Sequence, residues 1–108
     1  MNIAAARKLA PTLAALGDPV RLGIVLKLGK GGPLPTITLQ DGTGVTRQAV
    51  SKHLRLLEDA GLVTSERDGR DRLWRIEAGR VAELGQMLDR LSAQWDARIE
   101  RLRKFVEG

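Results

Sequence analysis

The chain has 108 residues, with 18 lysines and arginines against 13 aspartates and glutamates, one histidine and no cysteine. This length fits one domain with one hydrophobic core. The formal net charge of +5 favours an anionic partner, with nucleic acid ahead of an acidic protein or an anionic membrane surface. The absence of thiols and the single imidazole exclude disulfides, thiolate chemistry and sites that need two histidines.

The aromatic and apolar residues narrow the choice of partner further. Trp74, Trp95 and Phe105 are the only aromatic residues, which excludes a row of stacking platforms for single-stranded nucleic acid. No run approaches the roughly 20 apolar residues of a membrane span, and Arg7 and Lys8 interrupt the N-terminal apolar stretch. We therefore expect a cytoplasmic protein that does not use a membrane.

The first third of the chain predicts helices. Asp18 followed by Pro19 is typical of a helix start, because Asp caps free N–H groups and Pro loses no hydrogen bond there. The helix is expected to end in the glycine-rich run 29–33. A shorter helix is expected before it, with Pro11 in its first turn or at a kink. The segment 36–44 carries a weak pattern, and we expect a short helix there mainly because a strong helical pattern comes directly after it.

The segment 46–60 carries the strongest helical pattern, with Thr46 as N-cap and Gly61 at the C-terminal stop. At 100° per residue, one arc of this helix is wholly polar and the other is apolar. The polar arc holds Arg47, Gln48, Ser51, Lys52 and Arg55. The window 42–57 contains no acid, so it is the first place to seek phosphate contacts. His53 falls within the apolar arc, which favours a packing or capping role over direct phosphate contact.

The segment 62–76 predicts a β-hairpin, because Asp68-Gly69 lies between runs rich in β-branched and aromatic residues. With those two residues as the turn, the expected cross-strand pairs are Val63 with Trp74 and Arg67 with Arg70. The tip is then cationic. Like charges that face each other cost stability, which favours a ligand as the reason for them.

The last segment, 78–106, predicts a long helix with an apolar stripe. Its members are Val81, Leu84, Leu88, Leu91, Trp95, Ile99, Leu102 and Phe105. Such a helix is roughly 43 Å long, more than a domain of this size covers by itself. Part of the stripe must therefore meet another chain, or the helix must break, with Ser92-Ala93 the favoured place. Residues 76–108 carry no net charge, which suits the association of this segment with the same segment of a second copy.

A helix with a basic face, preceded by a short helix and a turn and followed by a cationic hairpin, is the layout of a winged helix-turn-helix. We expect a mainly α fold with a small β-hairpin wing, dimerising through terminal helices. The whole of 1–108 is expected to form one domain. Residues from about 9 to 77 form its DNA-binding lobe, and residues from about 78 to 107 form the C-terminal dimerisation helix or helices.

The chain also resembles a known family. The run TRQAVSKHLRLLEDAGLV at 46–63, with ALGDPVRL at 15–22, resembles the ArsR family of bacterial transcriptional regulators. The resemblance covers about residues 9–77. It implies a homodimeric repressor that binds a double-stranded operator near its own promoter. In such a dimer the two recognition helices are expected about 34 Å apart on an inverted repeat.

The resemblance also implies which residues face DNA. The matching positions are Thr46, Arg47, Gln48, Ser51 and Lys52, and the polar arc contains the last four of them. Arg47 and Gln48 suit base edges, since Arg pairs with guanine and Gln with adenine. The expected phosphate contacts are Thr46, Ser51, Lys52 and Arg55.

The wing and the last helix carry the other expected contacts. The wing arginines are Arg67, Arg70 and Arg72; they either meet the flanking minor groove or backbone, or pair locally with the neighbouring acids Glu66, Asp68 and Asp71. The expected dimer contacts are Leu84, Leu88, Leu91 and Trp95.

Many relatives sense a metal through cysteines or through His and acidic clusters on the last helix, and this chain departs from both patterns. The carboxylates of the last segment are expected to form a solvated helix face and not a metal site. They are Glu83, Asp89, Asp96, Glu100 and Glu107. We expect no metal site and no cofactor. We also expect no enzyme activity, since a nucleophilic Cys, a free His and a Gly-rich phosphate loop are all missing.

Two other functions fit the same pattern. One is a MarR-type regulator with a ligand pocket between the last helices and the DNA-binding lobe. The other is a winged-helix module that binds protein and has lost its DNA affinity. The salt dependence of binding separates the second from a DNA-binding regulator.

Overall fold

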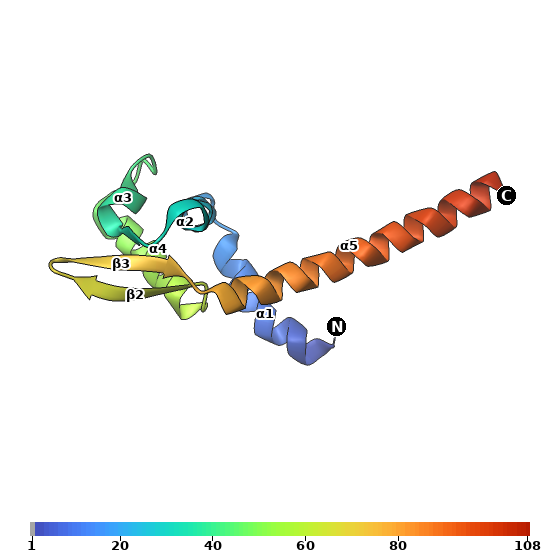
Figure 1. The fold of residues 1–108 in the computed structure, drawn as a ribbon, viewed down its shortest axis with the longest axis horizontal. Helices are drawn as coiled ribbons and strands as arrows, with labels where there is room; N and C mark the ends of the chain where they lie inside the picture. Colours follow the sequence, from blue (N-terminus) through green and yellow to red (C-terminus); the bar gives the residue numbers. More distant parts are fainter. Residues whose placement is uncertain (1) are drawn as a thin grey trace.

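The computed structural model describes residues 2–108 (Figure 1), and in this range it contains five helices and three strands. In chain order these are α1 (Ile3–Leu16), α2 (Pro19–Gly31), β1 (Leu34–Pro35), α3 (Thr36–Gln40), α4 (Arg47–Asp59), β2 (Val63–Asp68), β3 (Asp71–Ile76) and α5 (Ala78–Glu107). The first seven elements form a lobe, and most of α5 projects from it as an arm. The mainly helical fold with a small β-wing is confirmed.

The two helices with the clearest start signals in the sequence begin directly after their predicted N-caps. The Asp18 side chain accepts a hydrogen bond from the Arg21 N–H at 3.0 Å, which caps α2. The Thr46 hydroxyl accepts one from the Ala49 N–H at 3.1 Å, which caps α4. After α4, Gly61 takes a φ of +78°, a conformation that glycine adopts without strain.

The first helix is longer than its leucine spacing predicts. It begins at Ile3, after Asn2 accepts a hydrogen bond from the Ala5 N–H. Pro11 therefore lies inside α1 rather than in its first turn. Among residues 2–108 no single helix is long and apolar enough to cross a membrane, and α1 and α2 reach that length and composition only together, bent by 97°.

The three strands form one antiparallel sheet in the order β1-β3-β2. The sequence predicted only the hairpin, so β1 is an addition: Leu34 pairs with Trp74 and Pro35 with Leu73. This short strand joins the segment before α3 to the wing. The wing is thereby attached directly to the helix-turn-helix.

The predicted hairpin register is wrong by two residues. The structure pairs Ser65 with Trp74, Arg67 with Arg72 and Asp68 with Asp71, so the turn is Gly69-Arg70. Gly69 has a φ of +61°, and glycine at the first central position is typical of a type II′ turn. Like charges still face each other near the tip, as predicted, although the pairs are different.

One apolar core holds the lobe together. Its buried members are Leu9, Ala15, Ile24, Leu28, Leu39, Val50, Leu54, Leu57, Leu62, Val63, Trp74 and Leu84. Two polar groups inside it are satisfied: the Thr12 hydroxyl donates to the Ala60 carbonyl, and the Trp74 indole N–H donates to the Thr36 hydroxyl at 2.9 Å.

The last helix is continuous from Ala78 to Glu107, so the predicted break at Ser92-Ala93 does not occur. The molecule measures 66 × 29 × 20 Å, and its radius of gyration is 17.8 Å, against about 13 Å for a compact chain of this size. Leu84, on the stripe, is only 6% exposed because it packs in the lobe's own core. From Leu88 onward the stripe lies on the projecting arm.

Candidate nucleic-acid interface

The polar arc of α4 faces solvent, opposite the core. Its exposed members are Arg47, Gln48, Lys52 and Arg55, and Ser51 is half-buried; the N-cap Thr46 is exposed as well. On the other side of the helix, Val50, Leu54 and Leu57 are fully buried. The apolar face thus anchors α4 to the lobe and leaves its basic face free for a partner.

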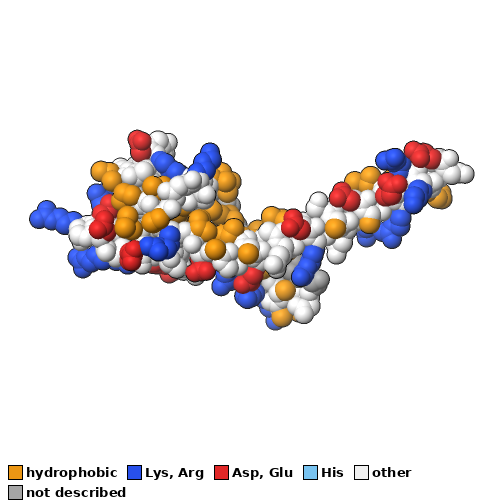
Figure 2. Space-filling model, viewed as in Figure 1, with side chains coloured by type: hydrophobic (Ala, Val, Ile, Leu, Met, Phe, Trp, Pro, Cys, Tyr) orange, Lys and Arg blue, Asp and Glu red, His pale blue; other side chains and the backbone are white. Residues whose placement is uncertain are grey.

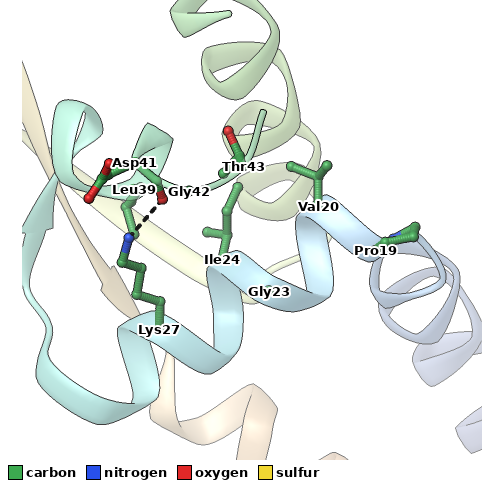
Figure 3. A pocket seen from close by; sticks show the side chains of 9 residues that line it. All are labelled: Pro19, Val20, Gly23, Ile24, Lys27, Leu39, Asp41, Gly42 and Thr43. Carbon is green, nitrogen blue, oxygen red and sulfur yellow. Dashed lines mark hydrogen bonds between the residues drawn. The ribbon is translucent and has the colours of Figure 1, made fainter. Parts of the chain in front are cut away.

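The turn between α3 and α4 is held from α2, as Figure 3 shows. The Lys27 ammonium group donates a hydrogen bond to the Asp41 carbonyl at 3.1 Å, drawn in Figure 3. It donates a second one to the Thr38 carbonyl, in α3, at 2.7 Å. Ile24 and Val20 of α2 line the same hollow of about 270 Å³. These contacts set the position of the helix-turn-helix, and no sequence pattern identified Lys27.

His53 lies on the inner side of α4, where the helical wheel predicts it. Its Nδ1 atom is 3.2 Å from Nη1 of Arg21 and 3.9 Å from the Asp18 carboxylate. Arg21 also donates through Nε to the Ala15 carbonyl. The hydrogen bond from the backbone N–H of Arg21, ahead of the charge of the Arg21 guanidinium, holds the pKa of the Asp18 carboxyl below its ordinary value. The cluster joins α4 to the start of α2.

The wing arginines lie in different places. Arg72 donates through Nε to the Ser65 hydroxyl, which donates to the Glu58 carboxylate on α4. Arg67 donates to the carbonyl of Gly69 in the turn. The third, Arg70, belongs to the turn itself and is exposed.

A cleft of about 360 Å³ separates α4 from the wing. Five of the predicted contact residues line it: Arg47, Ser51, Arg55, Arg70 and Arg72. The others, Thr46, Gln48, Lys52 and Arg67, are not among its lining residues. The cleft therefore gathers cations from two elements that are far apart in the sequence.

Asp71 also lines this cleft, and its connection to α4 was not predicted. Its carboxylate lies 3.3 Å from the Arg47 guanidinium. Although partial burial raises the pKa of this carboxyl, hydrogen bonds from the Thr36 hydroxyl and from two backbone N–H groups lower it more, and Arg47 adds to that. Asp71 is thus ionised at neutral pH. Of the acids on the wing, Glu66 pairs with Arg75 at 2.6 Å, and Arg75 is not one of the three arginines that the sequence predicted as partners.

Thr46→Ala is expected to lower the free energy of unfolding by about 1 kcal/mol, because the first turn of α4 loses its cap. Thr46→Ser keeps the hydroxyl and is the matched control. The measurement is urea unfolding of both variants at one protein concentration. Equal stability of the two variants would contradict the capping role.

In the described part of the chain, 2–108, no three side chains of His, Cys, Asp or Glu lie close enough together to hold a metal ion. His53 is engaged with Arg21. The observed geometry is thus that of a basic surface on a helix and a wing.

Comparison with known proteins agrees with this geometry. A family model described as a helix-turn-helix domain matches residues 16–66. The transcriptional regulator NmtR of Mycobacterium tuberculosis is 41% identical over 80 residues, which cover 74% of this chain and 66% of NmtR. The transcriptional repressor SmtB of the same organism is 40% identical over 72 residues, covering 67% of this chain and 53% of SmtB. The chain thus spans between half and two thirds of these relatives.

Solved structures cover more of the chain. An ArsR-like transcriptional regulator from Rhodococcus sp. RHA1 superimposes with a TM-score of 0.71 and 32% identity, over 93% of each chain. A homodimeric winged helix-turn-helix DNA-binding domain, Mb0332 of Mycobacterium bovis, does so with a TM-score of 0.67 and 26% identity, over 85% of this chain and 84% of that one. This chain belongs to the ArsR family of winged helix-turn-helix, DNA-binding transcriptional regulators.

Proposed function

We propose that this protein is a homodimeric repressor that binds an inverted-repeat DNA operator. The observation that carries the proposal is the basic cleft between α4 and the wing, on a lobe from which an apolar arm projects. The SmtB relative is a repressor and the Mb0332 domain is a homodimer, which supports both parts of the proposal.

The arm supports dimerisation. Figure 2 shows hydrophobic side chains along it, and the exposed ones are Leu88, Leu91, Trp95, Ile99, Leu102, Phe105 and Val106. A continuous exposed stripe of this kind is typical of an association surface. Of the predicted dimer contacts, Leu88, Leu91 and Trp95 are about half exposed and available to a partner, whereas Leu84 is covered by the chain's own lobe. The neutral charge of 76–108 lets two copies pair without net repulsion.

The α4 surface supports DNA recognition in the major groove. Arg47 and Gln48, in the first turn, are proposed to read base edges. Thr46, Ser51, Lys52 and Arg55 are proposed to contact phosphates. The wing arginines, Arg67, Arg70 and Arg72, are proposed to contact the flanking backbone or minor groove.

The proposed repressor works without a Cys or His metal-sensing site. The chain has no cysteine, and its one histidine is hydrogen-bonded to Arg21 between two helices. An inducer of this protein would therefore be recognised by another chemistry than thiolate or imidazole coordination.

A salt titration tests the proposal. The intact protein is titrated against DNA from upstream of its own gene at several salt concentrations. If the dimer neutralises six or more phosphates, log K should fall against log salt with a slope steeper than about −5. A flat dependence would contradict the proposal and would favour a protein-interaction module.

Lys52→Ala is expected to weaken binding to operator and unrelated DNA alike and to make the salt slope about two units shallower per dimer, because a phosphate contact carries no sequence information. Lys104→Ala removes the same charge near the end of α5 and is the matched control. The measurement is the same titration on both DNAs. A slope unchanged by Lys52→Ala would remove this residue from the interface.

A further inference from the structure

A series of neighbouring polar groups runs along the cleft from the core, through Asp71, to the start of α4. The indole N–H of the buried Trp74 donates a hydrogen bond to the Thr36 hydroxyl. Thr36 is buried as well, with 4% of its surface exposed. Thr36 lines the same cleft as Asp71, and the backbone N–H of Arg72 donates a hydrogen bond to the Asp71 carboxylate at 2.7 Å. Arg47 completes the series at the surface. Asp71 begins β3, the central strand of the sheet, so the sheet and the hydrogen bond from Arg72 determine where its carboxylate lies.

Arg47 is the most exposed member of this series. It is the first residue of α4, its side chain is 50% exposed, and its Nη2 atom is 3.3 Å from Oδ1 of Asp71. A free arginine side chain has many rotamers, and binding DNA must restrict them. Contact with a fixed carboxylate restricts them in advance. Because the guanidinium has five N–H donors, it can keep its ion pair with Asp71 while it presents other donors to a base.

The position of this acid is unfavourable for binding DNA in general. Asp71 lies in the cleft with Arg55, Arg70 and Arg72, and its lowered pKa keeps it negative at neutral pH. A carboxylate at a surface that receives phosphates lowers the affinity for every DNA sequence. The carboxylate is favourable if it lowers the affinity for unrelated DNA more than the affinity for the operator, because specificity is the difference between these two affinities.

We propose that Asp71 is a specificity-determining positioning residue that orients the Arg47 guanidinium for base recognition; this inference rests on the proposed function. Arg47 reads the base. Asp71, from the wing, holds the plane of the guanidinium and lowers the affinity for unrelated DNA. The wing therefore contributes to sequence recognition through the recognition helix as well as by its own contacts.

The test uses D71N in the full-length chain. The ratio of operator affinity to affinity for unrelated DNA is expected to fall about tenfold, a share of the discrimination that one bidentate arginine supplies. The affinity for unrelated DNA is expected to rise, because a negative charge has gone. E66Q is the matched control: it removes one carboxylate from the same hairpin, where Glu66 pairs with Arg75, and is expected to leave the ratio unchanged.

A second measurement separates positioning from folding. Each operator base pair is replaced in turn, and binding of wild type, D71N, R47A and the double variant is compared. D71N and R47A are expected to lose preference at the same base pair, and D71N is expected to have no further effect on that preference in R47A. A uniform loss at all positions, or an unchanged preference, overturns the role of Asp71. Absence of salt-dependent operator binding by the wild type overturns the proposed function itself.

Discussion

Leu91→Asp is expected to convert the protein from a dimer to a monomer and to lower its operator affinity by at least about 100-fold. Leu91 lies on the arm, 48% exposed, between Leu88 and Trp95 on the same stripe. In a two-fold interface one substitution changes both subunits, so two carboxylates must leave water without a partner. Each monomer then holds one half-site alone, and the gain from binding two linked sites is lost.

Ala93→Asp is the matched control for this prediction. It adds the same charge to α5 but lies about 200° around the helix from Leu91, away from the stripe. Light scattering gives the mass in solution, and the DNA titration gives the affinity. A dimeric Leu91→Asp with wild-type affinity would place the interface elsewhere.

Helix boundaries followed from the sequence wherever a cap and a stop stand at the two ends. Asp18-Pro19 and Thr46 each start a helix by satisfying local N–H groups, and Gly61 ends one by its positive φ. These are interactions within four residues, which a pattern can show. The basic arc of α4 followed for the same reason, because a helix fixes which residues share a face.

The hairpin register depended on a choice between two turns. A turn at Asp68-Gly69 of type I′ places both residues at positive φ, which costs a non-glycine residue about 1 kcal/mol or more. A turn at Gly69-Arg70 of type II′ requires this only of Gly69, and the structure has no non-glycine residue at positive φ among those described. Because the two registers differ by two residues, both keep the same side chains facing the core, and burial does not distinguish them.

The contacts that connect distant segments were not predictable from spacing. Strand β1 is only Leu34–Pro35, and its partner, Trp74, lies 40 residues away. The Asp71–Arg47 pair joins residues 24 positions apart, on β3 and α4, and no local pattern shows that these two elements meet. The predicted break at Ser92-Ala93 assumed that one lobe must cover all of α5. The structure instead leaves the apolar arm exposed.

Leu54→Ala is expected to lower the free energy of unfolding by about 3 kcal/mol, within the range of about 2 to 5 kcal/mol for buried leucines. Leu54 is 0% exposed, on the face of α4 that packs against the lobe. Truncation removes buried methyl groups and leaves a cavity that a rigid core fills only partly. Against a typical total of about 5 to 15 kcal/mol, this loss is large.

Leu56→Ala is the matched control, because Leu56 belongs to the same helix but is 43% exposed. Its expected loss is under about 1 kcal/mol. Urea unfolding must be compared at one protein concentration, since association stabilises the folded state by mass action. If both variants lose the same stability, the apolar face of α4 does not anchor it. If only Leu54→Ala does, the packing that stabilises the lobe also holds α4 in place, and with it the proposed DNA contacts Arg47, Gln48 and Lys52.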